Sequence, residues 1–253
     1  MKLLMGFVLL SVLGAALALP LQSTAEEDPE LTAGYFEGDI VLEPNQRNGL
    51  RNETRRWPNN LVYYKFNEGF FDNDHKNHIL RGMRILEEVS CIRFQEATGD
   101  QSYYINITGL SGGCYSSVGW QNGVRSYNLQ IYPLDTGCFR LGTIVHEFLH
   151  TLGFYHMQSA ANRDDYVRIA TENIQAGTEH NFNKYDEDFV DDFDEEYDYG
   201  SVLHYSAYAF SANGKMTIVP LREEEASVMG QRRSLSQSDI NKLNIMYRCP
   251  LKV

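Results

Sequence analysis

Basic residues are scarce in this 253-residue chain. It has 22 Lys and Arg against 34 Asp and Glu, which gives a formal net charge of −12. A surface of this sign repels phosphate groups, which argues against nucleic acids and anionic membranes as partners. No internal repeat is evident, and the length fits one domain of ordinary to large size plus processed segments.

Long hydrophobic runs are also absent, except for residues 3–19 at the N-terminus. This run follows the single base Lys2 and ends in Ala16-Leu17-Ala18, a small-residue cleavage site, so residues 1–18 are predicted to be a secretory signal peptide. A membrane anchor is the alternative. However, the run is barely long enough to span a bilayer, and Pro20 and a polar stretch follow it directly. We therefore expect a secreted, extracellular protein without a membrane anchor.

Cysteine is sparse, with four residues and no C-x-x-C pair. The missing pair argues against a cysteine-ligated zinc site. In a secreted chain an even number of cysteines indicates disulfides, and spacing alone leaves three pairings open. The four residues are Cys91, Cys114, Cys138 and Cys249.

Residues 19–47 differ in composition from the rest of the chain, with seven acidic residues and one basic residue. Their one compact apolar piece is residues 35–41. The sequence Arg47-Asn48-Gly49 is a basic site suited to a trypsin-like activating protease. We interpret 19–47 as a propeptide and 48–253 as the mature domain, the alternative for 19–47 being a disordered N-terminal tail.

Several segments show the patterns of regular structure. Asp72 and Asp74 can cap a helix that runs to about Ser90. Ser236 can cap a final helix that ends near Tyr247. Strand-like runs and a helix before residue 140 indicate an α+β lobe. The predicted strands are residues 61–66, 92–94, 103–107 and 126–132.

The stretch His146-Glu147-Phe148-Leu149-His150 contains H-E-x-x-H, followed by x-x-G-x-x-H. On a helix, His146 and His150 project from one face and can share a tetrahedral Zn²⁺. Glu147 is placed to act as general base. Gly153 can end the helix in a left-handed turn that returns His156 as third ligand. Three protein ligands leave one position open, which is typical of a catalytic site with one Zn²⁺ per chain.

A lone H-E-x-x-H also occurs in amphipathic helices that carry two surface histidines. The glycine and third histidine at metzincin spacing favour the metal site. The remaining histidines His75, His78 and His180 show no partner pattern, and we interpret them as ordinary surface or core residues.

Two sequons predict a glycoprotein. They are Asn52-Glu53-Thr54 and Asn106-Ile107-Thr108. Asn106 lies in a strand-like run, whereas Asn52 precedes the first predicted strand.

Beyond the zinc motif, residues 36–249 resemble the astacin family of metzincin zinc endopeptidases. The matching stretches are Phe36-x-Gly38-Asp39, Arg47-Asn48, Trp57-Pro58, Cys91-Ile92-Arg93-Phe94, Gly113-Cys114-Tyr115-Ser116, the zinc motif, Tyr197-Asp198-Tyr199-x-Ser201-Val202-Leu203-His204-Tyr205, Ala209-Phe210-Ser211 and Gly230-Gln231-Arg232.

The resemblance implies a two-lobed α+β metzincin fold with the zinc helix at the floor of a cleft. The N-terminal lobe would be a twisted sheet with helices, and the C-terminal lobe largely irregular with a final helix. The implied disulfides are Cys91–Cys249 and Cys114–Cys138. We expect a monomer, and the resemblance implies an endopeptidase that cleaves internal bonds of protein or peptide substrates.

The resemblance also implies roles for three residues outside the zinc motif. Asp39 would be the propeptide switch that occupies the open position of the zinc. Tyr205 would be a mobile extra ligand whose hydroxyl stabilises the oxyanion. Arg232 would lie at the floor of the pocket just past the scissile bond and favour acidic side chains.

Four positions depart from the family pattern: Met157, Ala160, Asn162 and Leu203. In the family, a glutamate at position 157 receives the trimmed N-terminus, and a methionine stands at 203. These departures leave open a catalytically silent binding protein that has kept the fold. The complete ligand set, Glu147 and the switch favour an active endopeptidase.

Overall fold

The computed structural model describes residues 28–42 and 53–250. The predicted signal peptide 1–18, the cleavage site between Arg47 and Asn48, and the sequon residue Asn52 lie outside these ranges. In the described ranges, no helix has both the length and the apolar character needed to cross a membrane.

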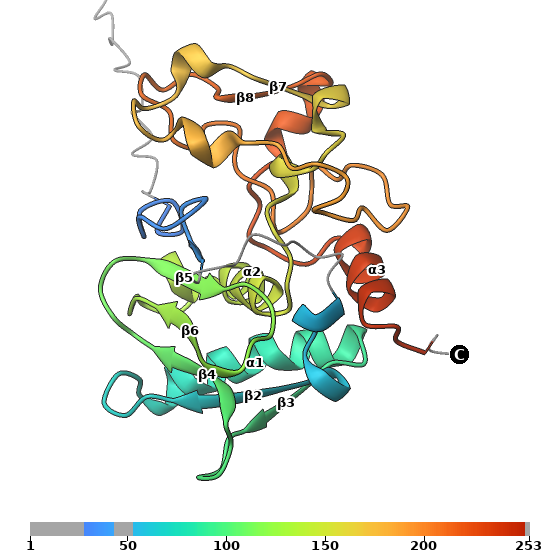
Figure 1. The fold of residues 1–253 in the computed structure, drawn as a ribbon. Coiled ribbons are helices and arrows are strands. Elements are labelled where there is room, and N and C mark those ends of the chain that lie inside the picture. The colour runs from blue at the N-terminus through green and yellow to red at the C-terminus, as the bar shows by residue number, and fades with distance from the viewer. Residues whose placement is uncertain (1–27, 43–52, 251–253) are drawn as a thin grey trace, which may run out of the picture.

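The first of two lobes is built on a six-stranded mixed sheet (Figure 1). Its strand order is β1-β5-β6-β4-β2-β3, and β1 and β5 run opposite to the other four. The alternating apolar residues that predicted β2 and β4 place Val62, Ile105 and Ile107 in the core. The strands are Ile40–Val41, Leu61–Phe66, Arg93–Glu96, Tyr103–Thr108, Cys114–Ser117 and Gly123–Leu129.

Helices α1 (Asn73–Val89) and α2 (Leu141–Thr151) pack against the sheet and against each other (Figure 1). Asp72 caps α1 by accepting a hydrogen bond from the backbone N–H of His75 at 2.8 Å. Gly82 allows the close approach, because a Cβ there would lie 2.5 Å from Ile144 of α2. Helix α2, which carries the zinc motif, is therefore buried along nearly its whole length.

The second lobe is largely irregular, as predicted. Its sheet consists of the short antiparallel strands β7 (Val167–Ile169) and β8 (Ile218–Pro220), which the sequence did not predict. A separate core of aromatic and aliphatic side chains fills the lobe. Short 3₁₀ turns occur in both lobes, at Glu53–Arg55, Pro58–Asn60, Gly137–Phe139, Met157–Ser159, Arg163–Asp165, Thr171–Asn173, Glu179–Phe182 and Glu223–Ser227.

The final helix α3 (Gln237–Met246) returns to the first lobe. Ser236 and Asp239 form a reciprocal capping box at its start. Leu243 and Met246 join the core of the first lobe. The disulfide Cys91–Cys249 fixes the chain just after the helix.

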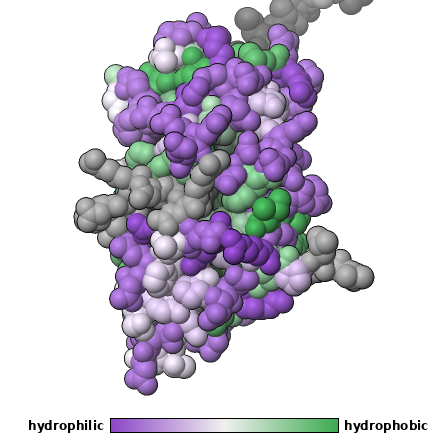
Figure 2. All heavy atoms as spheres, turned by 45° about the vertical axis from the view of Figure 1, so that its right-hand side comes forward, coloured by the Kyte–Doolittle hydropathy of each residue, from purple (hydrophilic) through white to green (hydrophobic). Residues whose placement is uncertain are grey.

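The α+β prediction is confirmed, and both disulfides, Cys91–Cys249 and Cys114–Cys138, have the pairing that the resemblance implied. The predicted strand at 126–132 is wrong at both ends, because β6 begins at Gly123 and ends at Leu129. Gln130 leaves the ladder: its side-chain oxygen accepts hydrogen bonds from the N–H groups of Gly112 and Gly113. The exposed face in Figure 2 is mostly hydrophilic, with small, separate hydrophobic groups.

Residues 28–42 of the predicted propeptide lie between the two lobes, beside β5 (Figure 1). Strand β1 extends the sheet by pairing in parallel with β5, so that Ile40 lies opposite Ser116. The backbone N–H of Ser116 also donates to the carbonyl of Asp39 at 2.9 Å. This pairing brings the predicted switch residue close to the histidines of α2.

Candidate active site

The turn after α2 brings the third histidine back toward the first two. Gly153 has φ +109°, a left-handed conformation that side chains other than glycine rarely adopt. Its N–H donates to the carbonyl of His150 at 2.7 Å, and the N–H of Phe154 donates to Leu149 at 3.0 Å. The chain therefore reverses within three residues, and the ring centroids of His150 and His156 lie 4.7 Å apart.

Each of the three imidazoles is oriented through its Nδ1 atom. Nδ1 of His146 lies 2.7 Å from the carbonyl oxygen of Val202, and Nδ1 of His150 lies 2.7 Å from that of Phe154. Carbonyl oxygens only accept, so both rings carry their proton on Nδ1. Nδ1 of His156 faces the Glu37 carboxylate at 2.8 Å. All three Nε2 atoms are thereby available as ligands.

The Asp39 carboxylate lies where the three Nε2 atoms converge. Its Oδ2 is 3.0 Å from Nε2 of His146 and 3.4 Å from Nε2 of His156, and its Oδ1 is 3.6 Å from Nε2 of His150. One ligand atom from each of these four buried residues lies within 4.8 Å of the others. The helix, the turn after it and the segment 28–42 thus supply one site.

The donor set and its unsatisfied atoms fit a metal ion. Nε2 of His146 and Nε2 of His150 are 3.0 Å apart, and both carry lone pairs, which a shared cation would satisfy. Nε2 of His156 and Oδ1 of Asp39 are buried without a hydrogen-bond partner. Burial lowers the pKa of His146 to about 4, which keeps that ring neutral. Three imidazoles and one carboxylate suit tetrahedral Zn²⁺.

Glu147 follows the first ligand on α2 and is fully buried. Neither carboxylate oxygen has a hydrogen-bond partner. Burial, and then the carboxylates of Asp39 and Glu30, raise the pKa of Glu147 well above its ordinary value. A buried carboxyl group without a partner is costly unless the site supplies one, so this position suits proton transfer rather than structural support.

Tyr205 is buried beside His156, with ring centroids 4.6 Å apart. Its hydroxyl donates to the backbone carbonyl of Glu37 at 2.5 Å. The hydroxyl that the resemblance links to the oxyanion is therefore held by the backbone of the predicted propeptide.

Glu37 is a site residue that the sequence did not predict. Its carboxylate accepts from Ser159 at 2.9 Å and from the Tyr185 hydroxyl at 2.5 Å, in addition to its contact with His156. It is fully buried and has φ +48°. An acidic residue in the matching stretch from Phe36 to Asp39 was the available signal, but the resemblance implies a role only for Asp39.

Arg232 lies in the loop before α3 and is buried against Glu30 of the predicted propeptide. Arg232 Nε is 2.9 and 2.7 Å from the two carboxylate oxygens, and Nη2 also binds one of them. Burial raises the pKa of Glu30, but Arg232, together with His146 and Arg140, lowers that pKa to about 2. Gly142 permits this position, because a Cβ there would lie 2.1 Å from the Arg232 backbone.

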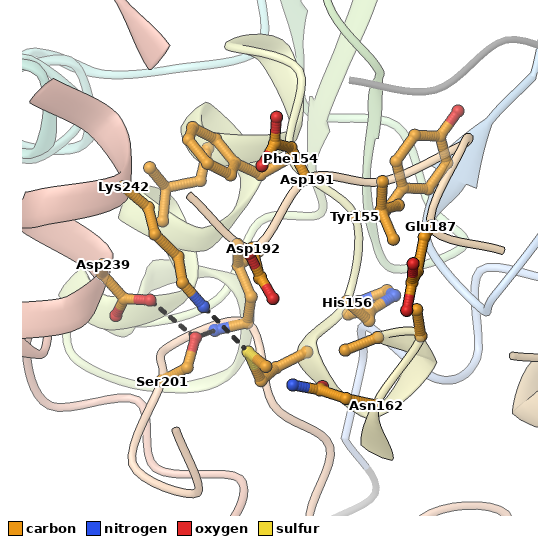
Figure 3. A pocket seen from close by; sticks show the side chains of 16 residues that line it. Phe154, Tyr155, His156, Asn162, Glu187, Asp191, Asp192, Ser201, Asp239 and Lys242 are labelled. Atoms are coloured by element: carbon orange, nitrogen blue, oxygen red, sulfur yellow. Dashed lines mark hydrogen bonds between the residues drawn. The ribbon is translucent and has the colours of Figure 1, made fainter. Parts of the chain in front are cut away.

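A cavity of about 300 Å³ lies next to His156, which is one of the residues that line it (Figure 3). Met157, which replaces the family's glutamate, lines it, and its sulfur lies 3.5 Å from Nζ of the largely buried Lys242. The carboxylate of Asp239, which also lines the cavity, already accepts hydrogen bonds from the hydroxyl of Ser201 and the backbone N–H of Val202. The position that would receive a new N-terminus therefore already faces an ammonium group.

The other singled-out residues lie away from this cluster. His75 bridges Asp72 and the carbonyl of Tyr132, and His78 contacts the carbonyl of Phe139. Asn106 is half-buried in β4, between β2 and β6. None of them contributes to the metal site.

Comparison with known proteins gives consistent matches. The model of the astacin peptidase family matches residues 49–248. Seminal metalloprotease 1 of Drosophila melanogaster is 48% identical over 228 residues, or 88% of this chain and 90% of that protein. Zinc metalloproteinase nas-4 of Caenorhabditis elegans is 34% identical over 235 residues, or 89% of this chain and 72% of that protein.

A solved structure agrees with these sequence matches. High choriolytic enzyme 1, a hatching enzyme zinc-protease from Oryzias latipes, has a TM-score of 0.70 and 32% identity. The match covers 79% of this chain and 97% of that one. The family model spans most of the chain, and the histidine cluster supplies a site for one Zn²⁺. The chain belongs to the astacin family and is a zinc metalloendopeptidase.

Proposed function

We propose that this protein is a secreted, monomeric endopeptidase without a membrane anchor, made as an inactive precursor that an activating protease cleaves between Arg47 and Asn48. One observation carries the proposal. The Asp39 carboxylate, from the segment before that cleavage site, lies among the three histidine Nε2 atoms. Protein or peptide substrates would bind in the position that the propeptide vacates.

His146, His150 and His156 would hold the zinc ion. When bound by neutral imidazoles, zinc polarises a carbonyl group and lowers the pKa of a water molecule. The hydrogen bonds from Nδ1 of His146 and His150 keep those rings in the required tautomer and orientation. The polypeptide thus fixes the ligand geometry before any substrate arrives.

Glu147 would accept a proton from the attacking water and pass it to the leaving nitrogen. Its burial and raised pKa suit a group that holds the proton between these two transfers. Tyr205 would donate its hydroxyl proton as a hydrogen bond to the oxyanion. That step requires removal of the propeptide, since the Glu37 carbonyl now accepts the same hydrogen bond.

The experiment is an activity assay of the trypsin-activated protein on a peptide library, with and without a chelator. We expect cleavage within peptides, loss of cleavage with the chelator and recovery on adding Zn²⁺. A folded, activated protein that binds Zn²⁺ but cleaves no peptide would instead support the silent binding protein.

Glycan occupancy of Asn52 and Asn106 is read from the mass of the secreted protein before and after enzymatic deglycosylation.

A further inference from the structure

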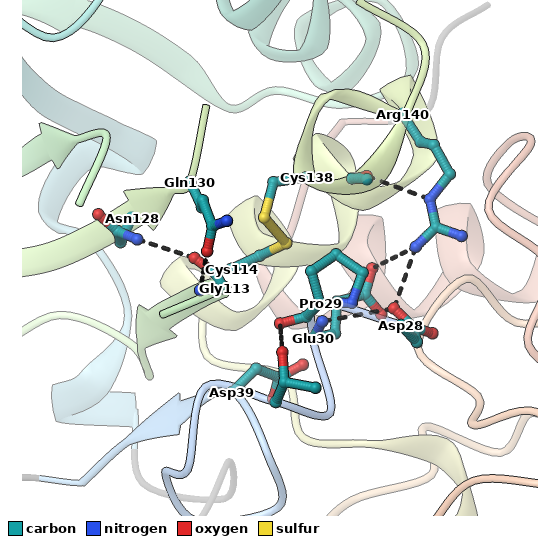
Figure 4. Close-up of a disulfide and its surroundings, with 12 residues drawn as sticks. Asp28, Pro29, Glu30, Asp39, Gly113, Cys114, Asn128, Gln130, Cys138 and Arg140 are labelled. Atoms are coloured by element: carbon teal, nitrogen blue, oxygen red, sulfur yellow. Dashed lines mark hydrogen bonds and ion pairs between the residues drawn. A yellow bond between two sulfur atoms is a disulfide. The ribbon is translucent and has the colours of Figure 1, made fainter. Parts of the chain in front are cut away.

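Two arginines from distant parts of the chain meet beside the metal site. Arg140 immediately precedes α2, and Arg232 lies in the loop before α3. Both face the start of the described propeptide segment. Arg140 Nη2 is 3.0 Å from Oδ1 of Asp28 and 3.9 Å from Oε1 of Glu30 (Figure 4).

The pair formed by Glu30 and Arg232 is the more deeply buried of these contacts. The side chains are 1% and 3% exposed, so the pair is largely removed from water. Nε and Nη2 of Arg232 bind the carboxylate together, a fork geometry that gives both strength and directional specificity. A buried guanidinium without its partner is costly, so loss of Glu30 leaves a site that favours another carboxylate.

The backbone holds Glu30 and Asp39 in one compact loop. The carbonyl of Pro29, which lies beside the disulfide in Figure 4, accepts from the N–H of Cys114 at 3.2 Å. The carbonyl of Asp39 accepts from the N–H of Ser116 at 2.9 Å. Both ends of the loop are therefore attached to β5.

Two glycines permit this attachment. A Cβ at Gly113 would lie 2.2 Å from the Pro29 carbonyl oxygen, and a Cβ at Gly38 would lie 2.8 Å from the Glu30 carbonyl oxygen. The carboxylates of Glu30 and Asp39 consequently approach the same imidazole, at 4.0 and 3.0 Å from Nε2 of His146.

We propose that Glu30, supported by Asp28, is a second anchor of the inactive precursor that occupies the Arg140–Arg232 site separately from the Asp39 contact with the metal site. The proposal rests on the proposed function, because it assumes that this cleft is the substrate site. Two anchors on one chain raise each other's effective concentration, so the propeptide binds more tightly than either contact alone would allow.

Binding of synthetic peptides to the activated protein tests the second anchor directly. A fluorescent peptide of residues 28–42 is titrated in four forms: unchanged, Glu30→Gln, Asp39→Asn and Leu42→Ala. Glutamine keeps the shape of Glu30 but removes its charge, so the Kd should rise about tenfold or more. Leu42→Ala is the matched control, because Leu42 is 37% exposed and its loss should change the Kd little. A Glu30→Gln peptide that binds as tightly as the unchanged peptide would overturn the proposal.

The uncleaved precursor provides an independent measurement. Asp39→Ala should release only part of the activity, and adding Glu30→Gln should raise it further by about tenfold. Equal activity of the single and double variants would overturn the second anchor. The peptide titration needs no turnover, so the anchor can be confirmed or rejected even if the activated protein fails to hydrolyse peptides and the proposed function is wrong.

Discussion

The partner of Nδ1 fixes the ring orientation of each histidine and leaves its Nε2 atom available as a metal ligand. His146 and His150 donate to backbone carbonyls of the enzyme itself. Nδ1 of His156 instead contacts Glu37, which lies in the predicted propeptide. The proposed removal of this segment would therefore change the environment of one ligand as well as open the site. We expect the third ligand to be the one whose orientation differs most between precursor and active enzyme.

Arg232 should select substrates. In the proposed activated enzyme the guanidinium of Arg232 no longer binds Glu30. An acidic substrate side chain just past the scissile bond would then take the place of the Glu30 carboxylate. Arg232→Gln should lower kcat/KM for peptides with Asp or Glu at that position by about tenfold to a hundredfold, and leave neutral peptides nearly unchanged. Arg233→Gln is the control, because the side chain of Arg233 is exposed. Identical cleavage profiles for the Arg232 variant and the wild type would contradict this role.

The sequence predicted some site residues and missed others for a physical reason. The zinc motif is local: its three histidines lie within eleven consecutive residues, so helix geometry and one turn are enough to relate them. Glu37 meets His156 across 119 residues, and Glu30 meets Arg232 across 202. Such pairs are set by how the lobes and the propeptide pack, which no local spacing reveals. The role of Asp39 follows only from the resemblance of the whole stretch to a known family.

At the scale of elements, the turn after α2 positions the third zinc ligand, His156. Gly153→Ala would force a Cβ into a left-handed conformation at φ +109°, which should cost about 1–2 kcal/mol of folding stability. We also expect weaker zinc binding, because this turn sets the position of His156. Urea unfolding and competition with a metal chelator measure the two effects.

Gly177→Ala is the matched control for this variant. Gly177 has φ +91°, and a Cβ added there would have no atom within 4 Å, so the variant should lose similar stability without weaker zinc binding. Zinc affinities that fall equally in both variants would show that the turn has no special influence on the third ligand.

The cavity next to His156 leads to a prediction about the new N-terminus. Met157 offers only a weak acceptor, and Lys242 already approaches it at 3.5 Å. An ammonium group from Asn48 placed beside Met157 would meet the ammonium of Lys242 in place of the family's carboxylate, which disfavours a buried contact at this position. Proteins that start two residues before or after Asn48 should therefore differ little in activity and Tm. A sharp optimum at one start residue would indicate that an acidic residue on the cavity wall, such as Asp192, has replaced the glutamate.

The sequence predicted helices and strands correctly where a capping residue or a clear apolar pattern marks them. The capped helices and the strand at 61–66 lie where the sequence predicted them. The predicted boundaries of β6 are wrong because pairing with β4 from Tyr103 to Thr108, rather than local composition, sets its length. Strands β7 and β8 have three residues each, too few to show alternation.

At the scale of the molecule, α3 and its disulfide return the end of the chain to the first lobe. In the chain-entropy model the Cys91–Cys249 bond, which spans 158 residues, is worth about 5 kcal/mol, and Cys114–Cys138, which spans 24, about 3.5 kcal/mol. Replacing the first pair by serine should therefore destabilise the protein more than replacing the second, as measured by urea unfolding. A larger loss from the Cys114–Cys138 replacement would indicate that local packing outweighs loop length.

The most direct test of the whole account is the activated Glu147→Gln variant, measured for zinc content and peptide hydrolysis together. Glutamine keeps the size of the side chain but cannot accept the proton, so hydrolysis should fall by about 10²–10⁴-fold. Zinc should remain near one ion per chain, because Glu147 is not among the four residues whose ligand atoms converge. Wild-type rates of chelator-sensitive hydrolysis in this variant would contradict the assignment of the site.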